Sequence, residues 1–253
     1  MELKTIIYEK KGKIAYITMN RPEKLNALNI DLRSDLLRCW EDFAGDDNAW
    51  VAILNGAGKA FSVGADFGDM SPDPAKESLG GLQTGEIDVF KPIIATIHGY
   101  ALGVGASLAL ACDIRICAED LHFGYSNPRH GVQSIGGPTR LPRWTFPGEA
   151  MYYLLTTEHM DAAEAYRLGL VHKVVPTPED LVPEATKIAH KIMENSPMAI
   201  RTTKEAYTRG FGVQFMQALH ISKSADRRNK KTEDYQEGIA AFSEKRKPVW
   251  KGK

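Results

Sequence analysis

The sequence predicts a layered α/β core followed by a C-terminal helical extension. Short runs rich in β-branched and apolar residues recur over the first part of the chain and alternate with helical patterns. From Pro178 onward every periodic segment has the spacing of a helix. Repeated strand–strand–helix units followed by helices are typical of such a layered domain. We expect the core over residues 1–195 and the helical extension over residues 196–253.

The composition indicates one sizeable core, because the chain has 253 residues and 43% of them are hydrophobic. The 32 Lys and Arg residues equal the 32 Asp and Glu residues, so charge favours neither nucleic acid nor an anionic membrane. Cys39, Cys112 and Cys117 lack metal-ligand spacing and lie in apolar runs. No segment has the length of a membrane span or the composition of a secretory signal. We therefore expect buried, reduced thiols, a cytoplasmic protein, and no metal, nucleic-acid or membrane partner.

The first half of the chain contains most of the expected strands. Asn29 is a suitable N-cap for a helix over residues 30–44, whose apolar side chains fall on one face. A second helix is expected over residues 104–112. The β-rich runs predict strands over residues 5–8, 14–19, 50–54, 93–97 and 113–117.

The remaining segments are predicted to be loops and helices. Residues 71–90 hold several Pro and Gly without apolar periodicity, and a loop of this length in a compact domain is often a lid. Residues 121–147 are expected to be irregular, because Gly and Pro interrupt them. One strand is expected over residues 170–175, and the helices over residues 148–156, 161–168, 178–195, 197–209, 212–229 and 232–243.

A glycine-rich turn, His98–Val104, joins the strand over residues 93–97 to a helix. Such a turn places unpaired N–H groups and the positive end of a helix dipole at one point, which suits an oxyanion as well as a phosphate. Taken alone, the turn is equally consistent with close strand–helix packing. A second segment about forty residues earlier, Phe61-Ser62-Val63-Gly64-Ala65-Asp66, decides between these interpretations.

These segments together resemble the crotonase (enoyl-CoA hydratase/isomerase) superfamily. The resemblance covers essentially the whole chain in order, in residues 20–28, 61–66, 91–103, 154–156, 165, 169–171 and 238–248. It implies a crotonase-like spiral of ββα units with a C-terminal helical region that serves oligomerisation or acts as a lid. It also implies a lyase or isomerase of fatty acid metabolism that acts on an acyl-CoA thioester and assembles as a homotrimer or a dimer of trimers. Coenzyme A would enter as part of the substrate, with no separate cofactor.

The resemblance also assigns the oxyanion hole to the backbone amides of Ala65 and Val104. Removing one such donor typically lowers the rate by a factor of about 10²–10³. Lys24 is expected either to face the CoA phosphates or to be solvated, and the basic run near the C-terminus has the same two interpretations. The residues expected to contact the substrate and its CoA are Lys24, Leu25, Ala27, Ala65, Asp66, Phe67 and Gly103.

The sequence departs from the hydratase pattern at both acid/base positions. Hydratases of this family use two glutamates there, whereas this chain has Ser107 and Asn127. Neither residues 100–112 nor residues 121–148 contain any Asp or Glu. A general acid or base contributes a factor of roughly 10²–10⁴. We therefore expect an enzyme that stabilises an enolate but does not perform ordinary hydration.

Several residues are candidate replacements for the glutamates, and each has a purely structural alternative. Tyr125 and His130 lie in the appropriate loop, and Arg129 is suited to bind a substrate carboxylate, as in a malonyl-type decarboxylase. Ser107 with His130 suggests a thioester hydrolase, because the turn also resembles that of the Clp-type serine proteases, which share the spiral fold. The structural alternatives are that Ser107 only fills space in its helix and that Arg129 and His130 are solvated residues of a surface loop. A catalytically silent acyl-CoA-binding protein is the remaining possibility.

Three further residues have mainly structural interpretations. Asp66 is expected to cap the helical turn that begins near Phe67. His98 ends a strand beneath the glycine turn and is expected to be structural. Glu149 is the first carboxylate after the segment that lacks them, which makes it a candidate substitute acid.

Overall fold

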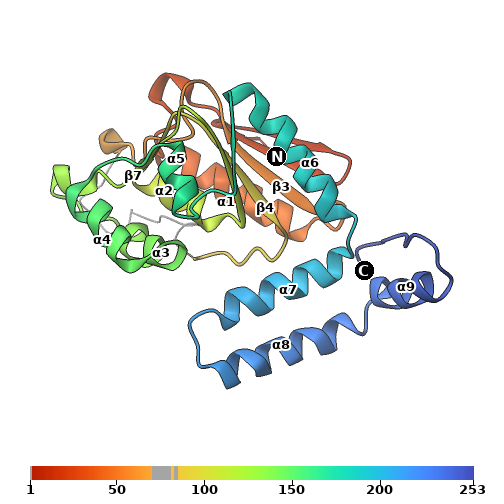
Figure 1. Ribbon diagram of the computed structural model, residues 1–253. Coiled ribbons are helices and arrows are strands. Elements are labelled where there is room, and N and C mark those ends of the chain that lie inside the picture. The colour runs from red at the N-terminus through yellow and green to blue at the C-terminus, as the bar shows by residue number, and fades with distance from the viewer. Residues whose placement is uncertain (1, 70–80, 83–84) are drawn as a thin grey trace.

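The computed structural model describes residues 2–69, 81–82 and 85–253. Most of the loop expected over residues 71–90 lies outside these residues. A six-stranded sheet forms the centre of the molecule, and its first two strands are antiparallel whereas the others are parallel (Figure 1). Its strands, in spatial order, are β1 (Ile6–Lys11), β2 (Ile14–Met19), β3 (Val51–Gly56), β4 (Ile93–Ile97), β6 (Ile114–Ala118) and β8 (Lys173–Val175).

A second, narrower layer of strand pairing accompanies the large sheet. β5 (Tyr100–Leu102) pairs in parallel with β7 (His122–Gly124). Single bridges extend this layer at Leu28–Ala65, Ser62–Ala101 and Phe123–Met160. The chain therefore passes from a strand of the large sheet to a short segment of the second layer and then turns back, once for each successive strand. This repeated path confirms the predicted spiral of ββα units.

Helices cover both faces of the large sheet. α1 (Ile30–Gly45) and α2 (Val104–Ala111) contribute to the core on one face, and α6 (Leu181–Met193) packs on the other (Figure 1). Every residue of β4 is buried, as expected for a parallel strand with helices on both sides. Asn29 caps α1 as predicted, because its side chain accepts a hydrogen bond from the Leu32 N–H.

The prediction that residues 121–147 are irregular is wrong. This stretch contains β7, a short 3₁₀ helix over Asn127–His130, and α3 (Gly136–Trp144). Pro138 lies in the first turn of α3, where no intrahelical N–H is needed, so it does not break the helix. The segments β5 and β7 have three residues each and depend on pairing between distant parts of the chain, which sequence periodicity does not reveal.

The remaining helices are close to their predicted positions. α4 (Pro147–Thr156) and α5 (Ala162–Arg167) precede β8, and α7 (Pro197–Gly210), α8 (Phe215–Asn229) and α9 (Glu233–Ser243) follow α6. Figure 1 shows α7, α8 and α9 extending away from the sheet. α7 begins two residues after the boundary expected at residue 195, and the division into two units stays a prediction.

Two expectations from composition concern the core and the membrane. The three cysteines are buried and free, and burial raises the pKa of the Cys112 thiol to about 12, so it is an inert thiol. Over the described part of the chain, none of the helices combines the length and apolar character that crossing a bilayer requires.

Candidate active site

The first half of the site is the backbone around Ala65, in the second strand layer. The Leu28 N–H donates to the Gly64 carbonyl at 2.7 Å, and the Asp66 N–H donates to the Leu28 carbonyl at 3.2 Å. Successive N–H groups of an extended chain point to opposite sides, so the Ala65 N–H is directed away from Leu28. No described residue accepts a hydrogen bond from it.

The second half is the N-terminus of α2. Val104 is the first residue of this helix, so its N–H has no acceptor within the helix. No other described residue accepts from it. The preceding Gly103 has φ of 54°, and its own N–H donates to the Gly124 carbonyl at 2.9 Å. This fixes the start of α2, and the positive end of its dipole, at the glycine turn.

Glycines bring the two halves into direct backbone contact. A side chain on Gly64 would begin 2.8 Å from the Leu102 carbonyl oxygen and 3.6 Å from the Val104 nitrogen. A side chain on Gly105 would begin 2.7 Å from the Ser62 carbonyl oxygen. The segments that carry Ala65 and Val104 are therefore in close backbone contact. Their two amides, which have no acceptor among the described residues, lie in neighbouring turns of the spiral.

Ser107 lies one turn into α2 and is buried. Its hydroxyl donates to the Gly103 carbonyl at 3.2 Å and lies 3.3 Å from the Tyr125 hydroxyl. A side chain on Gly136 would begin 2.0 Å from Ser107 Oγ, so the start of α3 closes directly over this serine. Burial raises the pKa of the Tyr125 phenol, which keeps the hydroxyl pair neutral.

Asn127 lies beside the turn that begins α2. Its Oδ1 is 3.1 Å from the point where a side chain on Gly103 would begin. This oxygen is buried, and it has no hydrogen-bond partner among the described residues. The structure therefore gathers Ser107, Tyr125 and Asn127 around the start of α2, and none of the three carries a charge.

Arg129 and His130, which come next in the same loop, have other neighbours. The Arg129 guanidinium donates to Thr157 twice, to Oγ1 at 2.6 Å and to the carbonyl at 2.9 Å. The His130 ring lies 5.2 Å from the Phe67 ring, measured between centroids. Hydrogen bonds of Ser107 to described residues involve no histidine, so these contacts give no support to a Ser107–His130 pair. The roles predicted for Arg129 and His130 stay predictions.

The loop expected to contact CoA is held by a residue that sequence reasoning did not identify. Asn26 is fully buried, with its amide donating to the carbonyls of Ala57 and Ala60 and accepting from the Arg21 N–H. Asn26 and Leu25 both have positive φ, at 54° and 48°. Asparagine tolerates this conformation better than most residues, which was the available signal. Of the predicted contacts in this loop, Ala27 is buried and Lys24 is exposed.

An ion pair joins this loop to the Ala65 segment. Arg21 Nη1 lies 3.0 Å from Asp66 Oδ2 and donates to the Ala27 carbonyl at 2.5 Å. The other Asp66 oxygen accepts from the Gly68 N–H at 3.2 Å, as the predicted cap of the turn over Phe67–Asp69. Asp66 is thus occupied in fixing backbone next to Ala65.

Two further sequence candidates have structural contacts. Glu149 pairs with Arg167 at 3.1 Å on the surface. His98 Nε2 lies 3.0 Å from the Gly58 carbonyl, beneath the glycine turn, as a structural residue would. Within the described ranges, no group of three or more His, Cys, Asp or Glu residues is placed to hold a metal ion.

Comparison with known proteins gives consistent similarity over the whole chain. A model of the enoyl-CoA hydratase/isomerase family matches residues 9–253. The short-chain-enoyl-CoA hydratase of Clostridium acetobutylicum is 38% identical, over 98% of this chain and 97% of that protein. The crotonyl-CoA hydratase of Syntrophomonas wolfei is also 38% identical, over 98% of each chain. A crystal structure of enoyl-CoA hydratase from Bacillus anthracis superposes with a TM-score of 0.92 at 35% identity, over 99% of this chain and 100% of that one.

Proposed function

The chain belongs to the enoyl-CoA hydratase/isomerase family of acyl-CoA enzymes, and from that premise we propose that it stabilises a thioester enolate without a carboxylate acid or base. The donors are the N–H groups of Ala65 and Val104. The polar side chains beside them are Ser107, Tyr125 and Asn127. Coenzyme A enters this proposal as part of the substrate, with no separate cofactor, and a cytoplasmic location stays a prediction.

The observation that carries the proposal is this pair of amides, for which the described part of the chain offers no acceptor. Fixed N–H donors directed at a carbonyl oxygen stabilise the negative charge that develops there, and they need no reorganisation during the reaction. Here the Val104 donor also lies at the positive end of α2. Since both donors are backbone groups, the valine at position 104 does not weaken the hole. A thioester oxygen that accepts from both would carry the enolate charge.

The neutral side chains limit the reactions open to such a bound thioester. Adding water to an enoyl thioester requires a base to activate the water and an acid to protonate Cα. The Ser107–Tyr125 hydroxyl pair and the Asn127 amide can hydrogen-bond a water or an acyl substituent, but none is a strong base at neutral pH. We therefore propose that hydration is slow, although the relatives compared with this chain are named as hydratases.

A second candidate reaction is decarboxylation of a malonyl-type thioester. In that step the bond between Cα and the carboxylate breaks, CO₂ leaves, and its electron pair becomes the enolate held by the two amides. No base is needed, and a neutral, buried surrounding favours loss of a desolvated carboxylate. The uncharged group formed by Ser107, Tyr125 and Asn127 is the observation that favours this reaction.

We also propose that the chain assembles as a trimer or a dimer of trimers. Large apolar side chains are exposed at three separate places, which are the start of α8 (Phe215 and Met216), α9 (Ile239 and Phe242) and the region of α4 (Phe146, Met151 and Leu155). Association between two different surfaces produces a closed ring when the rotation allows it.

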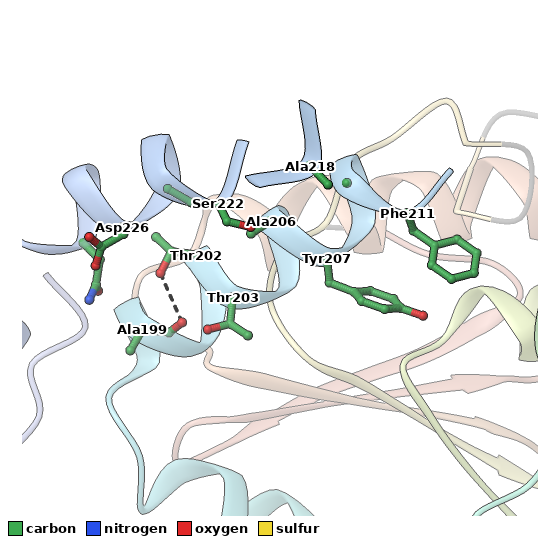
Figure 2. A pocket seen from close by; sticks show the side chains of 12 residues that line it. Ala199, Thr202, Thr203, Ala206, Tyr207, Phe211, Ala218, Ser222 and Asp226 are labelled. Atoms are coloured by element: carbon green, nitrogen blue, oxygen red, sulfur yellow. Dashed lines mark hydrogen bonds between the residues drawn. The ribbon is translucent and has the colours of Figure 1, made fainter. Parts of the chain in front are cut away.

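The helical extension also contains a groove between two of its own helices. It has a volume of about 560 Å³ and runs between α7 and α8, where Figure 2 shows the small side chains of Ala206 and Ser222 close together. Tyr207 and Phe211 at one end point away from α8. Light scattering during size-exclusion chromatography tests the assembly, because a monomer at micromolar concentration would contradict it.

The enolate proposal is tested by removing one backbone donor. Val104→Pro deletes the N–H at the first position of a helix, where proline is well tolerated, and Val104→Ala keeps the N–H as the matched control. The probe is acetoacetyl-CoA, whose enolate absorbs in the near ultraviolet. We expect the wild type and Val104→Ala to enhance the enolate band on binding. Val104→Pro should weaken enolate binding by a factor of about 10²–10³. An equal band in both variants would contradict the proposal.

A further inference from the structure

The loop over residues 125–130 presents alternate side chains to two different neighbours. Tyr125 contacts Ser107 of α2, and Asn127 lies against Gly103. Ser126, between them, has its hydroxyl 2.8 Å from Nε2 of His159. Two residues that face the proposed site are thus linked, through the residue between them, to the connection between α4 and α5.

We propose that His159 is a positioning residue, which together with Arg129 anchors this loop and so holds Asn127 at the start of α2. The inference rests on the proposed function only in that the loop borders the enolate site. Within the described part of the chain, the His159 side chain hydrogen-bonds Ser126 and neither Ser107, Gly103 nor Val104. Its hydrogen bond to the loop is the one to Ser126, and its ring also lies against Gly124, where a side chain would begin 3.1 Å from His159 Cδ2.

A second attachment lies next to the first. The Arg129 guanidinium donates to both Oγ1 and the carbonyl of Thr157, two residues before His159. Thr157 has φ of 58°, a left-handed conformation that is uncommon outside glycine and that these contacts help to hold. On the other side, Phe123 and Met160 exchange two backbone hydrogen bonds of 2.8 Å each. Residues 157–160 therefore bind the loop at Ser126 and Arg129, and they bind the strand just before it at Phe123.

The charges around His159 make this anchor sensitive to protonation. Burial lowers the pKa of its imidazole, and the positive charge of Arg129 and the proximity of His122 lower it further. Glu158, the adjacent carboxylate, accepts from the Tyr152 hydroxyl at 2.9 Å. Near pH 7 the imidazole is neutral and forms a hydrogen bond with the Ser126 hydroxyl. Acidification through its lowered pKa adds a cation beside the Arg129 guanidinium, which repels it.

The test compares His159→Ala with His159→Gln, whose neutral amide can still reach Ser126. The first measurement is hydrogen exchange of residues 125–132, which requires no turnover. We expect His159→Ala to accelerate exchange there at pH 7 and His159→Gln to leave it close to wild type. Wild-type exchange should rise as pH falls through the lowered pKa of His159, and His159→Gln should show no such rise after correction for the intrinsic rate. Unchanged exchange in His159→Ala would overturn the proposal.

The second measurement is steady-state kinetics on whichever thioester the wild type turns over. Among the described residues, no hydrogen bond joins residues 24–28, the expected CoA loop, to Ser126, Arg129, Thr157 or His159. We therefore expect His159→Ala to lower kcat by about tenfold while KM stays within about twofold. The His159→Gln variant should recover kcat near pH 7 and lose the acid limb of the wild-type profile. A KM effect without a kcat effect would overturn the positioning role. If the wild type turns over no thioester but His159→Ala still accelerates exchange, the positioning role of His159 is supported and only the proposed function is contradicted.

Discussion

The two halves of the site differ in which atoms supply their polar groups. Around Ala65 and Val104 the proposed donors are backbone amides, and neither has an acceptor among the described residues. Around Ser107 and Asn127 the polar groups belong to side chains, so a single substitution at either position can add or remove a carboxylate. A backbone site tolerates changes of side chain but depends on glycines for close approach, whereas a side-chain site can change its chemistry while the fold stays the same.

The largest effect is expected from Gly64→Ala, which disturbs the backbone that carries the Ala65 and Val104 amides. A methyl group there would begin 2.8 Å from the Leu102 carbonyl oxygen, at a φ of 100°. We expect a loss of about 3–4 kcal/mol in unfolding free energy, measured in urea, and loss of the enolate band of bound acetoacetyl-CoA.

Gly12→Ala is the matched control for this change. Gly12 also has positive φ, at 61°, but nothing lies within 4 Å of an added methyl group. The left-handed conformation alone should cost about 1–2 kcal/mol, with the enolate band unchanged. If Gly64→Ala and Gly12→Ala lose the same unfolding free energy and both keep the enolate band, the close backbone approach at Gly64 does not maintain the site.

Asn127→Glu addresses the side-chain half by supplying a carboxylate beside Gly103. Since a general acid or base contributes a factor of roughly 10²–10⁴, we expect crotonyl-CoA hydration to rise by about 10² at pH 7. Asn127→Gln has the same length without the charge and should give no increase. Equal rates in the two variants would show that the missing carboxylate is not what limits hydration.

Tyr125→Phe should have the smallest effect. It removes one hydroxyl from the pair with Ser107, which keeps its bond to the Gly103 carbonyl, so we expect a loss of at most about 1 kcal/mol near pH 7. The folded pKa of Tyr125 is raised above its unfolded value, so the contribution of this phenol to stability is present below pH 10 and is lost as pH rises further. The decline of wild-type stability above pH 10 should therefore be shallower in Tyr125→Phe. An identical alkaline decline in the two proteins would place the titrating group elsewhere.

The sequence predicted the large sheet and most helices, because β-branched runs such as residues 93–97 and caps such as Asn29 act locally. It did not predict β5, β7 or α3. The two strands form by pairing between distant segments. The glycines at the start of α3 resemble a loop in the sequence, whereas in the structure Gly136 packs directly against Ser107 and leaves no room for a side chain. Local patterns contain no information about such contacts between distant segments.

The candidate site shows the same limit. The motifs predicted Ala65 and Val104, and counting along the chain placed Ser107 and Asn127 at the acid/base positions. The partners of those residues were not accessible from sequence, since the Ser107–Tyr125, Ser126–His159 and Arg129–Thr157 contacts each join segments at least 18 residues apart. The buried role of Asn26 was missed because its neighbours Leu25 and Ala27 were interpreted only as contacts for the substrate and its CoA.

The most direct test of the account follows the absorbance of the conjugated thioester of crotonyl-CoA after mixing with excess wild-type protein, beside a competent hydratase. We predict that the absorption band shifts on binding, because two amides polarise the carbonyl. The band should then persist over times in which the control hydratase consumes it. Rapid loss of the band at the rate of the control would contradict the claim that neutral side chains leave this site without hydratase chemistry.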